Sequence, residues 1–141
     1  MLIDKFTKKC TIYINIPKDA IGERRFKKFV IDKCLIYGGS AERTSNGTIQ
    51  NIVNALTVTT KDIEHYKEPM KYLELPEDEK NGFFTAKPND YIVFDEVDDI
   101  VTTSAEFGAL QKKYANNGMS INSVNAYIYG LNTDNVTMTN A

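Results

Sequence analysis

The chain has 141 residues, of which 42% are hydrophobic and 26% charged, and 17 basic against 19 acidic residues give a net charge of −2. This length suits one domain with a hydrophobic core, and the composition excludes wholesale disorder. The slight acidic excess argues against tight nucleic-acid binding, which relies on basic residues to neutralise phosphates, but it is compatible with DNA that passes without being held. No apolar run approaches the length of a membrane span, and the N-terminus lacks signal-peptide features.

The N-terminal part of the chain predicts a β-hairpin. Residues 9–16, Lys-Cys-Thr-Ile-Tyr-Ile-Asn-Ile, are rich in β-branched and aromatic types, and Pro17 ends the run. A second strand is predicted from Arg25 to Tyr37, with an imperfect alternation that permits a bulge. Each strand carries one of the two cysteines, Cys10 and Cys34, which we interpret as buried reduced thiols. They have neither the spacing nor the histidine partner of a metal site.

Two stretches predict long loops, at about 38–48 and 61–80. The first, from Gly38 to Gly47, has almost no apolar content and carries an Asn-Gly turn signal at its far end. Residues Thr48 to Thr60 then predict a strand. The second loop contains two prolines and an acidic run, and a connection of this length is usually functional or mobile.

The C-terminal half predicts short strands and one helix. The strands are expected at residues 83–84, 91–94, 119–129 and, as a weak edge strand, 136–138. Ser104 is the expected N-cap of the helix, and Phe107, Leu110 and Tyr114 fall on one face of it.

These segments together predict about six strands and one short helix. The expected fold class is mainly β, a small antiparallel β-barrel or sandwich with long loops and one short flanking helix. We expect a single domain over residues 1–141, because the chain is too short for two comfortable domains.

No residue pattern predicts catalysis. The sole histidine, His65, has no nucleophile nearby, and Asp95–Asp99 lacks the alternating ligands and closing glutamate of a calcium loop. The basic cluster Arg24–Lys28 divides its charges between two strand faces, which is more typical of a charged edge or a protein contact than of a phosphate site. Gly38-Gly39 lacks the lysine-serine pair of a phosphate loop. We therefore predict no enzyme and no catalytic, metal-binding or cofactor-binding residues.

A resemblance covers most of the chain in order and spacing. The stretches that carry it are Thr11–Asn15, Cys34–Tyr37, Lys87–Val93, Ser104–Tyr114, Met119–Asn125 and Tyr129-Gly130. With these motifs the chain resembles the small head–tail connector proteins of tailed phages and prophages, in particular the head-closure (stopper) or minor capsid proteins of long-tailed phages of Gram-positive bacteria. Two positions depart from that pattern: Asn89 stands where glycine is usual, and the C-terminal stretch lacks a tryptophan.

The resemblance implies a small β-barrel with long loops that works as a structural virion protein. It would be made in the host bacterial cytoplasm and located in the neck of the virion, as a homo-oligomeric ring between the portal–adaptor complex and the tail. The ring would close the head DNA channel and provide the tail attachment surface. Its partners would be copies of itself, the adaptor or portal ring and the tail terminator or tail tube. Viral DNA would pass through the lumen without specific binding, and no membrane would be involved.

Two segments are candidate functional sites on this hypothesis. We expect the loop at 38–47 to face the lumen or an adjoining ring and to change conformation, because its glycines are permissive. The residues of this channel or partner loop are Gly38, Gly39, Arg43, Asn46 and Gly47. We also expect Glu64–Leu75 to become ordered on a partner through exposed side chains. The residues of this partner-contact segment are Tyr66, Met70 and Tyr72.

Two alternatives stay open. A tail terminator or tail completion protein would form a similar ring that caps the tail tube, and co-purification with heads or with tails separates the two. An alternative of another class is a small nucleic-acid-binding β-barrel that uses aromatic residues such as Tyr13, Phe26 and Phe29. A titration with a fluorescent oligonucleotide at low salt tests it.

Overall fold

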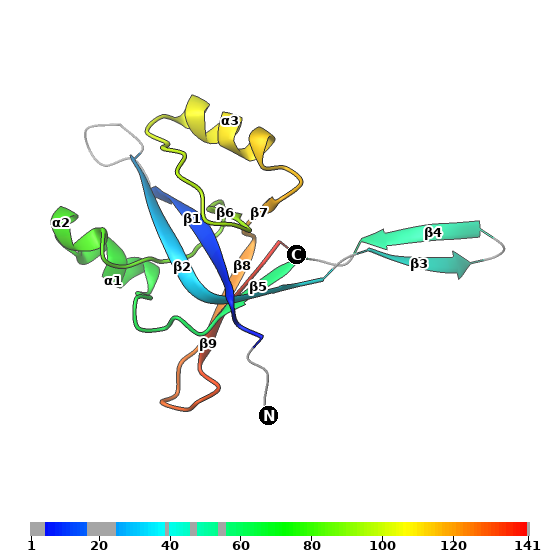
Figure 1. Cartoon of the computed structure of the whole chain (residues 1–141), viewed down its shortest axis with the longest axis horizontal. Coiled ribbons are helices and arrows are strands. Elements are labelled where there is room, and N and C mark those ends of the chain that lie inside the picture. The colour runs from blue at the N-terminus through cyan, green and yellow to red at the C-terminus, as the bar shows by residue number, and fades with distance from the viewer. Residues whose placement is uncertain (1–4, 17–24, 39, 46–47, 54–55, 141) are drawn as a thin grey trace.

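The structure is a computed structural model that describes residues 5–16, 25–38, 40–45, 48–53 and 56–140. Within these residues nine strands and three helices are present, and seven of the strands form one sheet (Figure 1). The strands are β1 (Lys8–Ile16), β2 (Arg25–Tyr37), β3 (Ser40–Ser45), β4 (Thr48–Val53), β5 (Thr57–Thr60), β6 (Tyr91–Val93), β7 (Gly118–Ser120), β8 (Ser123–Tyr127) and β9 (Asn135–Thr139). The helices are α1 (Pro69–Glu74), α2 (Glu77–Lys80) and α3 (Ser104–Lys113).

The main sheet has the strand order β7-β6-β1-β2-β5-β9-β8, and all its ladders are antiparallel. The register of the β1–β2 ladder shifts between Lys8, opposite Cys34, and Cys10, opposite Ile31, so β2 carries an extra residue there. Lys33 in this bulge has a φ of 56°, a conformation that a bulge can require of one residue. The mainly antiparallel β class predicted from the sequence is confirmed.

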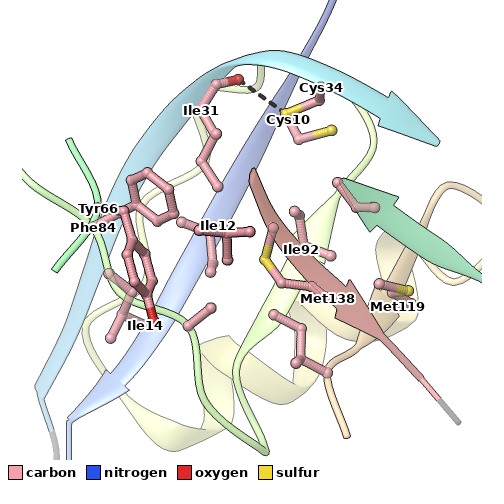
Figure 2. Packing of buried hydrophobic residues seen from close by; sticks show 14 of the residues in the cluster. Cys10, Ile12, Ile14, Ile31, Cys34, Tyr66, Phe84, Ile92, Met119 and Met138 are labelled. Atoms are coloured by element: carbon pink, nitrogen blue, oxygen red, sulfur yellow. Dashed lines mark hydrogen bonds between the residues drawn. The ribbon is translucent and has the colours of Figure 1, made fainter. Parts of the chain in front are cut away.

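Side chains of β1 alternate between two apolar clusters, because successive residues of a strand point to opposite faces. Ile12 and Ile14 are fully buried in the larger cluster, which contains residues of several strands and of the 61–94 region (Figure 2). Tyr13 enters a second cluster together with Phe107 and Leu110 of α3. Both faces of β1 are covered, which explains why the consecutive residues Cys10–Ile14 are all buried, the polar Thr11 included.

The two edge strands of the sheet, β7 and β8, are consecutive parts of one segment. Between them, the Ile121 amide donates to the carbonyl of Asp90 (2.8 Å) and the Asn122 amide donates to the carbonyl of Thr139 (2.9 Å). One stretch of chain therefore bonds to β6 at one end and to β9 at the other. The sheet coils, but β7 and β8 do not pair with each other and the sheet is not closed into a barrel.

The helices differ from the sequence prediction in number and in capping. The stretch expected as a loop at about 61–80 contains α1 and α2. Each helix begins at a proline, because Pro69 lies in the first turn of α1 and Pro76 is the N-cap residue of α2. The predicted helix at Ser104 is present as α3, but its N-cap is Thr103. The Thr103 hydroxyl accepts a hydrogen bond from the Glu106 amide (3.1 Å).

One predicted loop and two predicted strands differ from the structure. The stretch expected as a loop at about 38–48 contains β3 and the start of β4, which form a separate two-stranded sheet. The predicted strand 119–129 is divided into β7 and β8. The tail at 136–138, expected as a weak edge strand, belongs to β9, which lies between β5 and β8 inside the sheet. Val136 and Met138 are fully buried there, so this strand is part of the core.

Candidate interaction surfaces

A two-stranded ribbon of β3 and β4 leaves the body of the molecule between β2 and β5. Residues Ser40–Ser45 pair antiparallel with Thr48–Val53, and Figure 1 shows the ribbon pointing away from the main sheet. In the described part of the chain β3 and β4 pair only with each other. An isolated two-stranded hairpin is marginally stable in water. The β3–β4 ribbon follows the β2–β5 ladder, and beyond that ladder its strands have only each other's backbone hydrogen bonds.

Gly38 lies at the junction between β2 and the ribbon and has a φ of 117°. Glycine adopts this conformation readily, whereas it is costly for other residues, so the backbone at this junction favours glycine. Of the other residues predicted for the channel or partner loop, Arg43 lies within β3. Gly39, Asn46 and Gly47 lie outside the described residues.

The predicted partner-contact segment is folded onto the body, which corrects the expectation of three exposed side chains. Tyr66 is buried, with its ring 5.5 Å from that of Phe84, and Tyr72 is fully buried on the inner face of α1. Burial raises the pKa of Tyr72 to about 12. Met70 alone of the three is exposed, with 73% of its surface accessible. In an irregular stretch the sequence does not indicate whether an apolar side chain is buried or exposed. In α1 the helix directs Tyr72 inward and leaves Met70 exposed.

The turn between β8 and β9 displays an apolar patch that sequence reasoning missed. Its exposed residues, which we call the 127–131 patch, are Tyr127, Ile128, Tyr129 and Leu131. The signal for it was the run Tyr-Ile-Tyr-Gly-Leu beside the polar Asn-Thr-Asp. Exposed tyrosine next to aliphatic residues is typical of protein contact surfaces.

Asp134 holds this turn in a defined shape. Its carboxylate accepts hydrogen bonds from the amides of Tyr129 (3.0 Å), Gly130 (2.8 Å) and Leu131 (3.1 Å). These bonds keep the pKa of Asp134 below its usual value, because they favour the charged form. Gly130 has a φ of 79°, which suits a glycine at the tip of such a turn. The patch is therefore presented on a pre-organised loop.

A groove of about 460 Å³ lies beside β8. Its walls are formed by Tyr66, Pro69, Ala86, Lys87, Pro88, Asn122, Ser123, Val124 and Ala126. The only charged member, Lys87, is already engaged: its ammonium group contacts the carboxylate of the buried Asp90 and donates to the carbonyl of Asn15. The groove is thus lined by apolar, amide and hydroxyl groups.

A second hollow, of about 210 Å³, lies between α3 and the stretch that precedes it. Asp99 on its rim accepts from the Lys113 ammonium (2.8 Å) and from the Tyr114 hydroxyl (2.6 Å). These two donors hold the pKa of Asp99 below its usual value. The carbonyl of the same residue accepts from the buried hydroxyl of Tyr13 (2.7 Å), so Asp99 ties α3 to β1.

Several other ionisable residues form local pairs. His65 Nδ1 lies 2.7 Å from the carboxylate of Asp62. Glu77 of α2 binds Arg25 (3.1 Å) and Lys27 (3.3 Å) of β2. Hydrogen bonds with Lys80 and with Lys27 lower the pKa of Glu77. Among the described residues no three His, Cys, Asp or Glu side chains gather in a way that suits a metal ion. The helices of the described ranges are all too short or too polar to cross a membrane.

The two cysteines are neighbours on β1 and β2. Both are buried free thiols, as the sequence predicted, and Cys34 Sγ donates to the carbonyl of Ile31 (3.5 Å; Figure 2). The hydrogen bond with Cys34 and burial raise the pKa of the Cys10 thiol well above its usual range. A thiol that stays protonated is a weak nucleophile and a weak metal ligand. The hydrogen bond with Cys10 lowers the pKa of the Cys34 thiol, and both residues pack in the larger apolar cluster.

Comparison with known proteins places the chain in a family. Neither the curated proteins nor the solved structures gave a match. One family model matches residues 6–139, which is nearly the whole chain and spans every strand and helix described above. The chain belongs to DUF6751, a family of unknown function.

Proposed function

We propose that this chain is a structural subunit of the neck of a tailed phage. It forms a ring between the portal–adaptor complex and the tail, closes the head DNA channel after packaging and offers the tail its attachment surface. Its partners are further copies of itself, the adaptor or portal ring, and the tail terminator or tail tube. The protein is made in the bacterial cytoplasm and becomes part of the virion at the head–tail interface.

The observation that supports this function best is the division of the molecule into a body and an arm. The body packs apolar side chains on both faces of its sheet. The arm is the β3–β4 ribbon, whose strands pair with no other strand in the described part of the chain. A subunit of a ring needs this combination, because the body fixes the ring geometry and the arm reaches a neighbour or the lumen.

The charge distribution supports passage of DNA without tight binding. The chain has a net charge of −2. The only basic run predicted from the sequence is partly neutralised, since Arg25 and Lys27 share Glu77 of α2. A lumen with a strong basic excess would hold the phosphates and slow ejection, whereas these paired cations would not.

Replacement of residues 40–53 by a short Gly-Ser turn tests the role of the arm in phage particles. We expect heads that package DNA and then lose it, with the mutant protein still folded. A matched control is Ile100→Ala, which alters an exposed apolar residue of the body outside both candidate segments. Filled, tailed particles from the arm-deleted phage would contradict the proposal. Filled heads together with defective tails would instead favour the tail terminator.

A further inference from the structure

The outer edge of β8 is an uncharged strand edge. The main sheet has two edges among the described strands: β7 has three residues, and β8 has five. β8 reads Ser-Val-Asn-Ala-Tyr, and after Tyr114 the sequence contains one charged residue, Asp134, which is buried by its own turn. Soluble proteins usually protect an edge strand with lysine, proline or a cover, since an open edge pairs with other strands. β8 has no such protection in the part of the chain that the structure describes.

The groove beside β8 extends the surface available to an added strand. Val124 and Ala126 pair across the ladder with Met138 and Val136, which are fully buried, so all four face the core side of the sheet. Val124 is only half-buried and Ala126 is exposed, because the groove lies over them. Pro69, Ala86 and Pro88 form its opposite wall. An extended segment with apolar side chains at one face would fill this space.

A segment with these properties exists in the same chain. β4 has six residues, Thr-Ile-Gln-Asn-Ile-Val, without charge, proline or glycine. Its ribbon partner β3 carries Glu42 and Arg43, which makes β3 the poorer candidate for an uncharged groove. The length of β4 matches the five residues of β8. Figure 1 shows the ribbon extending away from the body that contains β8, so the match requires two copies of the chain.

We propose that β4 of one copy adds as a strand to the outer edge of β8 of a second copy and lays apolar side chains into the groove. Backbone hydrogen bonds would give affinity, and the groove would select an uncharged strand. The contact joins two different surfaces, so repetition gives a head-to-tail ring or filament rather than a closed dimer. This inference rests on the proposed function, because it names the contact between neighbouring subunits of the ring. The 127–131 patch, at the end of β8, would flank the added arm.

Disulfide cross-linking between two differently labelled copies tests the contact. One copy carries Ala126→Cys, and a second carries a cysteine at one of the six β4 positions in turn, with the buried native cysteines left in place. The pairs are mixed under mild oxidation at about 1 mM, where even a weak contact is populated. We expect a covalent heterodimer for one β4 position or for two positions two residues apart, because only those approach closely enough to bridge. No heterodimer at any of the six positions, or a homodimer of the Ala126→Cys chain alone, would overturn the proposal.

Two lysine substitutions in β8 test whether self-association depends on the groove or only on the strand beside it. Ala126→Lys places a charge in the groove and should weaken self-association about tenfold or more in sedimentation equilibrium. The matched control is Asn125→Lys, because Asn125 is exposed, neighbours Ala126 and points to the other face of the sheet. Thermal melts of both variants check folding. Equal association of both variants would overturn the groove as the binding surface.

The β4–β8 contact and the phage function can be tested separately. A ring of this protein in the neck without the β4–β8 cross-link would remove the contact and leave the function in place. The cross-link in a protein that is absent from neck particles would keep the contact and remove the phage function.

Discussion

The body and the β3–β4 ribbon show two ways in which strands of one chain are stabilised. In the body, β1 is covered on both faces, and Ile12, Tyr13 and Ile14 are fully buried. In the ribbon, two strands share one ladder and pair with no third strand among the described residues. Apolar burial on both faces therefore stabilises the body, whereas the ribbon has the backbone hydrogen bonds of a single ladder.

The largest loss of stability is expected for a substitution that creates a cavity in the body. Phe84 is fully buried, and its ring stacks 5.3 Å from that of Phe29. We expect Phe84→Ala to lower the free energy of unfolding by about 3–5 kcal/mol, because the transfer free energy is lost and a cavity remains. Urea denaturation measures this loss. Met70→Ala, at an exposed position of α1, is the control and should change stability by about 0.5 kcal/mol or less.

A pH titration of stability tests the buried carboxylate of the body. Asp90 is fully buried and accepts from the Asn15 amide (2.9 Å), and burial raises the pKa of Asp90 to about 6. This pKa lies above the pKa of an aspartate in the unfolded chain. The stability that protonated Asp90 contributes is therefore fully present below about pH 4 and is lost as the pH rises through about 6. Between these limits we expect the wild type to lose up to about 3 kcal/mol relative to Asp90→Asn. Parallel pH curves for both proteins would contradict the assignment.

A smaller effect is expected where α2 meets β2. Glu77 binds Arg25 and Lys27 and also Lys80 (3.0 Å), whose side chain is almost buried. We expect Glu77→Gln to cost about 1 kcal/mol, since these ion pairs are partly exposed and screened. Glu79→Gln in the same helix is the matched control and should be near neutral. Loss of the difference between these variants in 1 M salt would support the ionic cause.

The smallest effect on the body is predicted for removal of the arm. Replacement of residues 40–53 by a short turn should change the free energy of unfolding by about 0.5 kcal/mol or less, because the main-sheet ladders do not include β3 or β4. The melting curve of the shortened protein is the measurement. A loss comparable with that of Phe84→Ala would mean that the ribbon supports the body, and the comparison above would be wrong.

The sequence predicted most strands of the main sheet and missed β3. β2 has the predicted bounds, from Arg25 to Tyr37, and β1 begins one residue earlier than predicted. The sequence predicts a loop where β3 lies because Ser-Ala-Glu-Arg-Thr-Ser shows no apolar alternation, whereas β4 falls within the strand predicted at Thr48–Thr60. The sequence predicts β9 as a weak edge strand because it is short and has polar neighbours. Its pairing with β5 places it inside the sheet.

The candidate sites were harder to predict than the fold. The sequence pointed to the 38–48 region, where the structure has an arm, but it could not show that Gly38 takes a left-handed conformation at the junction. It placed Tyr66 and Tyr72 outside, whereas a helix of six residues turns Tyr72 inward. The groove beside β8 combines Pro69 with Ala126, residues far apart in the chain. Only the tertiary structure brings such residues together.

The most direct test of the central claim is an electron-microscopy reconstruction of the neck from particles that carry this protein. We expect a ring of the seven-stranded body between adaptor and tail, with each β3–β4 arm reaching a neighbouring subunit or the lumen. Density for the protein on the shell or at the tail tip, or its absence from the particles, would contradict the claim.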